Sequence, residues 1–201
     1  FEALVDEYRS HCRQGDFEGA FLFAQQQLLP GCSDDCPSSP EKLHRFVKER
    51  ICYLGFERWF GVMFYFVLFG PAGALAYRLL LLCRIDAEEP ERQRMLDRTQ
   101  YWVDWLPSRL LVFTFALTGD WVGSREQLAA SLGDTTSSTG ELLGDAAHAA
   151  LGLKATVFSG DSGDTQAFAE VSDWEVGQVQ SLLSRSAVAW VVVLALLVLL
   201  I

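Results

Sequence analysis

Cysteine and histidine side chains could bind a metal in this chain, and their spacing indicates whether they do. The five cysteines are Cys12, Cys32, Cys36, Cys52 and Cys83. Cys32 and Cys36 lie four residues apart, and only His44 follows nearby. A structural zinc site needs four ligands in closer pairs, so we predict free thiols, no metal site and a reducing compartment. We expect His44 to be solvated on a cationic helix face and His148 to pack against small neighbours.

Carboxylates are concentrated between Asp120 and Glu175. This segment contains ten acidic and two basic residues, which gives it a formal net charge of −8. The whole chain carries −10. Such a surface repels phosphate backbones, which excludes nucleic acid as a partner. We favour a solvated surface over an acidic docking site for this region.

The stretch from Phe56 to Cys83 is almost wholly apolar, and a Gly-Pro-Ala-Gly sequence at 70–73 interrupts it. Proline lacks an amide hydrogen and glycine disfavours helix, so we predict a break there. Each half would reach only about 20 Å, too short to cross a bilayer of about 30 Å. Cationic residues lie on both sides, at 42–50 and 84–98, which favours a membrane-embedded hairpin with both flanks cytoplasmic. A kinked span remains the alternative.

The other elements are predicted from apolar periodicity and from capping residues. Helices are expected over 1–14, 17–29, 40–51, 95–106, 127–132, 141–153 and 168–183, with loops at 30–39, 133–140 and 154–165. Pro107 is expected to end the helix at 106, and 110–117 is too short to span, so it is predicted to be a separate apolar helix. Residues 187–201 form a predicted C-terminal transmembrane helix.

These elements predict an all-α, polytopic helical membrane protein whose amphipathic helices pack at the cytoplasmic side. Four segments follow: an amphipathic part over 1–55, the broken apolar stretch over 56–83, a helical part with acidic loops over 84–186, and the terminal helix over 187–201. The chain begins without methionine and ends inside an apolar run, so we expect a longer membrane protein.

Three stretches are distinctive: Gly-Asp-Phe-Glu-Gly-Ala at 15–20, Gly-Pro-Ala-Gly-Ala-Leu-Ala-Tyr-Arg at 70–78 and Asp-Trp-Leu-Pro-Ser-Arg-Leu at 104–110. Together they resemble the integral-membrane adenosylcobinamide-phosphate synthases of the CobD/CbiB superfamily. The similarity covers about residues 1–152. The polar signatures of those ATP-dependent amide ligases are replaced at 52–58, 79–84 and 137–141, which implies that the ligase reaction is lost because phosphate and metal handling needs carboxylates and donors at fixed places.

The remaining features resemble the AmpE branch, through Ser-Leu-Gly-Asp at 131–134, the Asp-Trp-Leu-Pro-Ser-Arg sequence and the valine-rich terminal helix. This resemblance implies a multi-pass inner-membrane protein of bacteria with about two further helices before Phe1. It also implies a sensory role in β-lactamase induction and peptidoglycan signalling. The expected partners are the lipid bilayer and a cell-wall-derived small molecule or a protein, and no motif identifies a cofactor.

A regulator is therefore the first hypothesis, and a membrane enzyme related to the synthases is the second. Glu57, Asp104, Arg109 and Asp134 are the candidate functional residues, since they lie near matched motif positions and beside the apolar elements. Structural pairing is the commoner role for such residues. A transporter half or a channel element is a third hypothesis, suggested only by the broken apolar helix.

Overall fold

The computed structural model describes residues 2–14, 16–28, 40–85, 89–134, 137–152 and 165–200 of the 201-residue chain. Within these ranges every regular element is a helix and no strand occurs. The prediction of an all-α fold is confirmed for this part of the chain.

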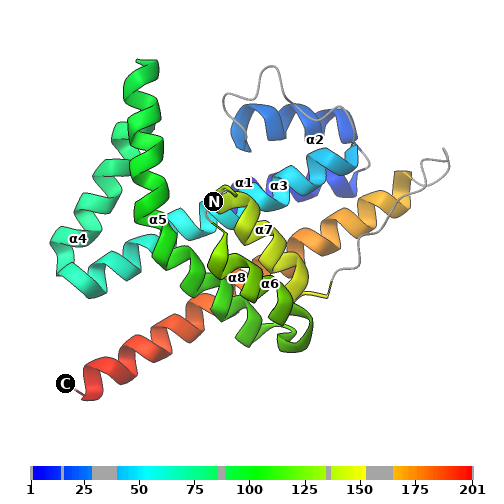
Figure 1. Ribbon diagram of the computed structural model, residues 1–201. Coiled ribbons are helices and arrows are strands. Elements are labelled where there is room, and N and C mark those ends of the chain that lie inside the picture. The colour runs from blue at the N-terminus through cyan, green and yellow to red at the C-terminus, as the bar shows by residue number, and fades with distance from the viewer. Residues whose placement is uncertain are drawn as a thin grey trace.

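The N-terminal helices α1 (Glu2–Arg13) and α2 (Phe17–Phe23) pack together and lie beside α3 (Figure 1). The Asp16 carboxylate accepts a hydrogen bond from the Gly19 amide at 2.9 Å, which caps α2. A π-helical turn, η1 (Ala24–Leu28), extends α2. The helix expected over 17–29 is therefore present as far as Leu28.

The central part of the chain has no loop between its elements, which are α3 (Pro40–Gly55), the π-helical turn η2 (Phe56–Phe60) and α4 (Gly61–Ile85). Helical geometry is interrupted at Gly70, whose φ of 67° and ψ of −156° suit glycine almost alone. Figure 1 shows α4 turning sharply at the left edge of the molecule. The interruption expected in the Gly-Pro-Ala-Gly sequence is thus found at its first residue.

The two halves of α4 pack against each other as a helical hairpin. The rings of Tyr65 and Tyr77 stack with their centroids 5.3 Å apart. A Cβ atom on Gly73 would overlap the Tyr65 carbonyl oxygen, and one on Gly61 would overlap the Tyr77 side chain. Glycine at these two positions therefore lets the halves approach closely. We call residues 61–85 the α4 hairpin.

One helix, α5 (Pro90–Thr118), contains Pro107 in its interior. The prediction of separate helices over 95–106 and 110–117 is therefore wrong. Proline at 107 removes the amide that would bond to the Val103 carbonyl. The hydroxyl of Tyr65 donates a hydrogen bond to that carbonyl at 2.8 Å, so the unpaired acceptor is satisfied by the α4 hairpin.

The last elements are α6 (Trp121–Gly133), α7 (Thr139–Ala150) and α8 (Thr165–Leu200). Asp120 caps α6, and its amide donates to the Ala150 carbonyl at 2.7 Å, which ties the start of α6 to the end of α7. A single helix, α8, covers both of the helices predicted over 168–183 and 187–201. The loop predicted over 154–165 lies almost wholly outside the described residues.

The core forms where α1, α3, α5, α7 and α8 meet (Figure 1). Its fully buried members include Val5, Val47, Ile51, Phe56, Leu111, Phe115, Leu143, Val176 and Leu182. Segments far apart in sequence are thereby held together, and α3 and α5 are placed on either side of α7.

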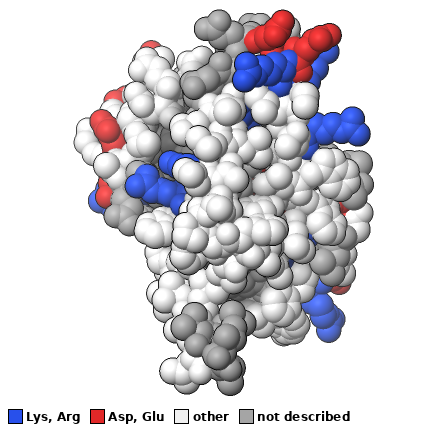
Figure 2. Space-filling model, turned by 90° about the vertical axis from the view of Figure 1, so that its left-hand side faces the viewer, with Lys and Arg blue, Asp and Glu red and all other residues white. Residues whose placement is uncertain are grey.

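Outside this core, the side of the molecule formed by the α4 hairpin and the C-terminal end of α8 carries exposed apolar side chains. We call it the apolar face, and it comprises Phe66, Val67, Leu68, Phe69, Leu75, Leu79 and Leu82 of α4 with Val188, Val191, Val192, Val193, Leu196 and Leu199 of α8. Figure 2 shows a broad surface on this side with few charged residues. By length and composition, the helical stretches 44–84 and 171–196 could each cross a membrane.

Candidate functional site

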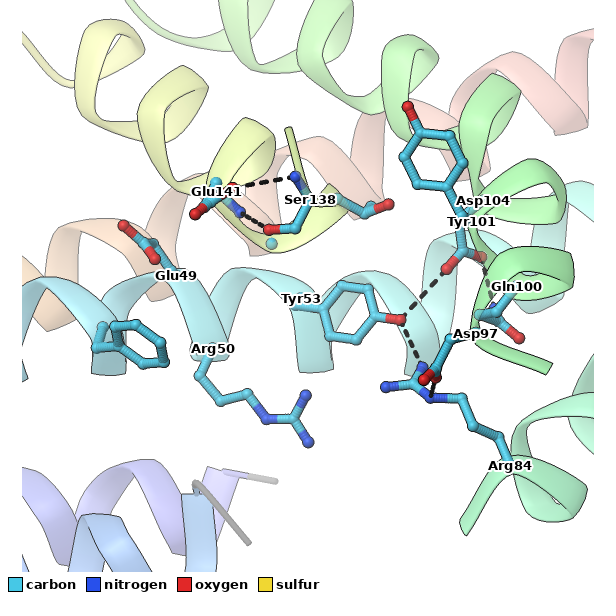
Figure 3. Close-up of a pocket in the computed structure, with 13 residues that line it drawn as sticks. Glu49, Arg50, Tyr53, Arg84, Asp97, Gln100, Tyr101, Asp104, Ser138 and Glu141 are labelled. Atoms are coloured by element: carbon cyan, nitrogen blue, oxygen red, sulfur yellow. Dashed lines mark hydrogen bonds and ion pairs between the residues drawn. The ribbon is translucent and has the colours of Figure 1, made fainter. Parts of the chain in front are cut away.

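A pocket of about 300 Å³ lies among α3, α5, the end of α4 and the start of α7 (Figure 3). Two helices supply most of its wall with the same spacing of i, i+3, i+4 and i+7, which places the four residues of each on one face. The residues are Phe46, Glu49, Arg50 and Tyr53 of α3, with Asp97, Gln100, Tyr101 and Asp104 of α5.

The start of α7 closes one side of the pocket with residues 138–141. Ser138 is the N-cap: its hydroxyl oxygen accepts from the Glu141 amide at 3.2 Å, and the Glu141 carboxylate accepts from the Ser138 amide at 3.0 Å. This reciprocal capping fixes the helix terminus and holds the Glu141 carboxylate at the pocket.

Asp104 is the hydrogen-bonding centre of the site and is only 1% exposed. Its Oδ1 accepts from Tyr77 Oη at 2.9 Å and from Gln100 Nε2 at 2.8 Å. Its Oδ2 accepts from Tyr53 Oη at 3.3 Å. Burial raises the pKa of Asp104 from its ordinary value to about 6, against the opposing effect of these three hydrogen bonds. The carboxyl group can therefore exchange a proton near neutral pH.

Arg84, near the end of the α4 hairpin, joins this centre to the pocket wall. Its Nη1 donates to Tyr53 Oη at 3.0 Å and contacts Glu57 Oε1 at 3.5 Å, and its Nε pairs with Asp97 Oδ1 at 3.0 Å. Figure 3 shows the Tyr53 hydroxyl between Asp104 and Arg84. Pocket wall and hairpin are thus linked by one continuous set of polar contacts, which we call the Asp104 network.

The four candidate residues from sequence fall into two groups. Glu57 and Asp104 both belong to the Asp104 network, through Arg84 and Tyr53. Arg109 is instead buried beside α6, where its Nη2 donates to the backbone carbonyl of Asp134. The Asp134 side chain accepts from the Ser137 amide at 3.1 Å. The structure therefore brings together Glu57 with Asp104, and Arg109 with Asp134.

Arg109 has contacts typical of a structural role. Its guanidinium lies 4.6 Å from the centre of the Trp105 ring, and its Nη1 donates to the Trp105 carbonyl at 3.1 Å and to Ser108 Oγ at 3.3 Å. These contacts hold the guanidinium against α5, so its bond to the Asp134 carbonyl fastens the segment after α6 to the middle of α5.

Sequence reasoning missed Tyr53, Tyr77, Arg84 and Gln100, all members of the Asp104 network. A usable signal was the repeat of polar residues at i, i+3, i+4 and i+7 in α5, which places Gln100 on the same helix face as the candidate Asp104. Tyr77 carries no such signal, because it lies within an apolar stretch.

The prediction of a solvated His44 is wrong. His44 is 7% exposed, with its Nε2 at 3.1 Å from Glu175 Oε2 and its Nδ1 at 3.4 Å from Tyr8 Oη. Lys48 pairs with the same carboxylate. Glu175 is 131 residues away in sequence, so helical periodicity around His44 could not indicate the partner.

The candidate metal-ligand and thiol residues can be placed only in the described part of the chain. No group of three or more potential ligands is close enough there to hold a metal ion. The thiols of Cys12 and Cys52 are buried and that of Cys83 is exposed, and all three are free. Cys32 and Cys36 lie outside the described residues.

Comparison with known proteins gives one result. Searches of curated proteins and of solved structures found no significant match. The family described as "Regulatory signalling modulator protein AmpE" matches residues 5–200, nearly the whole chain. The chain therefore belongs to the AmpE family of regulatory signalling modulators.

Proposed function

We propose that this protein is a multi-pass regulator of the bacterial inner membrane that acts in β-lactamase induction and peptidoglycan signalling, without ligase activity. The family description supports the regulatory part. The proposal adds that the pocket is the sensory site, and that the ligand is a cell-wall-derived small molecule or part of a protein partner.

The Asp104 network is the observation that carries this proposal. Tyr53 lines the pocket, while Tyr77 belongs to the α4 hairpin, and both donate to the same buried carboxylate. A ligand that displaces Tyr53 or Arg84 changes the hydrogen bonding of Asp104, and therefore the contact between α5 and the hairpin. Ligand binding can thus be converted into a movement at the apolar face.

Lipid is the proposed environment of the apolar face. Before Gly70 the helix continues from α3 and η2 without a loop, but its uncharged part begins only after Arg58 and would extend about 18 Å. The half after Gly70, 71–85, would extend about 22 Å, and both lengths are less than the hydrocarbon core of about 30 Å. A hairpin that enters the bilayer and returns fits these lengths, with the amphipathic helices on the cytoplasmic side. The matched stretches at 70–78 and 104–110 make a relationship to the CobD/CbiB superfamily part of this proposal.

Complementation of cells that lack the native protein tests the regulatory proposal. Asp104→Leu removes the acceptor shared by Tyr53 and Tyr77, so we expect loss of the effect on a β-lactamase reporter. Asp104→Asn retains a hydrogen-bond acceptor and should keep part of the effect on the reporter. Glu126→Gln, on an exposed part of α6, is the matched control. An Asp104→Leu protein that is present at the normal level and regulates normally would contradict the proposal.

The topology is tested separately by labelling thiols in intact cells. Arg45→Cys and Arg94→Cys introduce exposed thiols before and after the hairpin, in a Cys83→Ser background. The hairpin predicts the same accessibility at both positions, and opposite accessibility would show that the stretch spans the membrane.

A membrane enzyme related to adenosylcobinamide-phosphate synthase is the second candidate. The buried carboxyl of Asp104, with its pKa raised to about 6, is the observation that favours it, since such groups often act as proton donors or acceptors. Rescue of a strain lacking the synthase would establish this function, and we expect no rescue because the polar motifs are replaced.

A further inference from the structure

The pocket has an excess of hydrogen-bond acceptors, which indicates the chemistry of its ligand. Four carboxylates line it, those of Glu49, Asp97, Asp104 and Glu141, against the two guanidinium groups of Arg50 and Arg84. The lining therefore has a net negative formal charge, and an anionic ligand would be repelled by it.

The guanidinium of Arg84 is already occupied. Its Nε and Nη1 bond to Asp97, Tyr53 and Glu57 within the structure. Most of its capacity to donate to an anion is thus used. Arg50 lies over the face of Tyr53, 5.6 Å from the ring centre, which places it against the aromatic wall.

Several acceptors, in contrast, retain capacity among the described residues. Gln100 is only 2% exposed and lines the pocket, yet its Oε1 has no hydrogen-bond partner there. With the part of the chain that the structure describes, each of three carboxylates engages one oxygen: Glu49 Oε1 with Arg45, Asp97 Oδ1 with Arg84, and Glu141 Oε2 with the Ser138 amide. These groups require donors rather than acceptors from a ligand.

The arrangement of the carboxylates also selects between kinds of cation. No three of them are close enough within the described residues to hold a metal ion. An ammonium group needs only separate acceptors, and it is also attracted to aromatic faces. Phe46 and Tyr101 supply aromatic side chains in the same pocket, besides Tyr53, over whose ring Arg50 lies.

We propose that the pocket binds an organic amine through its primary ammonium group, with the carboxylates of Glu49 and Glu141 as the principal acceptors. The proposal deepens the function given above, since it rests on the pocket being the sensory site. A volume of about 300 Å³ admits a small diamine, an amino sugar or a short peptide.

Three probes of similar length test the charge of the ligand: 1,5-diaminopentane, 1,5-pentanediol and glutarate. Calorimetric titration uses the full chain in phosphatidylcholine nanodiscs at pH 7.5 and low ionic strength. We expect the diamine to bind at least about tenfold more tightly than the diol or the dicarboxylate. This ratio corresponds to about 1.4 kcal/mol in binding free energy. Equal or tighter binding of either comparison probe, or no binding of the diamine, would overturn the proposal.

Two variants locate the binding. Glu141→Gln retains an oxygen for the Ser138 amide, so the cap of α7 survives while the charge is lost. Glu49→Gln removes a charge from α3. Each should weaken diamine binding about threefold, as expected for one partly exposed ion pair, and Glu126→Gln should not. Unchanged affinity in both folded pocket variants would contradict the assignment.

A lipid headgroup and a soluble metabolite could both supply the ammonium group. Replacing half of the phosphatidylcholine by phosphatidylethanolamine separates these sources, because a lipid ligand would compete with the diamine and a soluble one would not be affected. The reporter assay with Asp104→Leu measures regulation and does not depend on these titrations, which measure diamine binding. If Asp104→Leu abolishes regulation but the unsubstituted protein does not bind the diamine, the regulatory proposal stands and only the proposed class of ligand is wrong.

Discussion

The pH dependence of stability should reveal the buried carboxyl of Asp104. Its pKa is about 6 in the folded protein and 3.8 as an ordinary value, so between these pH values the folded state binds more protons than the unfolded state. Stability from this group is fully present below pH 3.8 and is lost as the pH rises through 6. The difference between these two pKa values corresponds to about 3 kcal/mol in the free energy of unfolding, at about 1.4 kcal/mol for each pKa unit.

Asp104→Asn should remove this loss of stability with rising pH. The amide keeps an acceptor for Tyr77 and Gln100 but cannot ionise. Its Nδ2 cannot accept from the Tyr53 hydroxyl as Oδ2 of the carboxylate does, and we expect the loss of this hydrogen bond to cost about 1 kcal/mol. Asp104→Leu leaves the buried donors of Tyr77 and Gln100 without a partner, which should destabilise the fold by about 3 to 5 kcal/mol.

The measurement is the free energy of unfolding by denaturant in detergent micelles, at intervals from about pH 3 to about pH 8. The wild-type protein should show a larger loss of stability over this range than Asp104→Asn, by about 3 kcal/mol. Glu126→Gln controls for the removal of an exposed carboxylate. Identical pH dependence in the wild-type and Asp104→Asn proteins would refute the reasoning, because another group would then be responsible.

Three further substitutions test the packing of the fold, each by the free energy of unfolding. Tyr65→Phe leaves the Val103 carbonyl without a donor and should cost about 1 to 2 kcal/mol; no loss would mean that another group satisfies this acceptor. Gly73→Ala places a Cβ against the Tyr65 carbonyl and should cost about 2 kcal/mol or more, whereas a neutral effect would show that the hairpin opens freely. Glu175→Gln leaves Lys48 without its carboxylate in a largely buried site and should cost about 3 kcal/mol, and a stability equal to wild type would contradict the burial of this pair.

Local chemistry made part of the fold predictable from sequence. The break at Gly70 follows from a glycine and a proline that disfavour helix whatever surrounds them. Pro107 shows the limit of the same rule: its effect on α5 depends on a tyrosine 42 positions earlier in the chain, whose hydroxyl replaces the missing donor. A breaking residue therefore predicts an unsatisfied carbonyl reliably, but tertiary structure decides whether the helix ends.

The sequence predicted members of the candidate site only where an acidic residue lies beside an apolar segment. Asp104 and Glu57 stand beside apolar segments, and the structure joins them in one network. Tyr77 could not be identified, because an aromatic residue in an apolar stretch is expected to pack rather than to donate a hydrogen bond. The Arg109 contact with a backbone carbonyl was equally invisible, since backbone acceptors have no sequence signature.

The uninterrupted length of α8 has a mechanical consequence. Glu175 is held by His44 and Lys48 near one end, whereas Leu196 lies on the apolar face about 30 Å further along at 1.5 Å per residue. Between these two points Val176, Leu182 and Ser186 are buried, so this part of α8 is packed against the core and moves with α3 and α5 as one body. In the lipid environment proposed above, a displacement of the apolar end of α8 would therefore act on the contacts of Glu175 with His44 and Lys48.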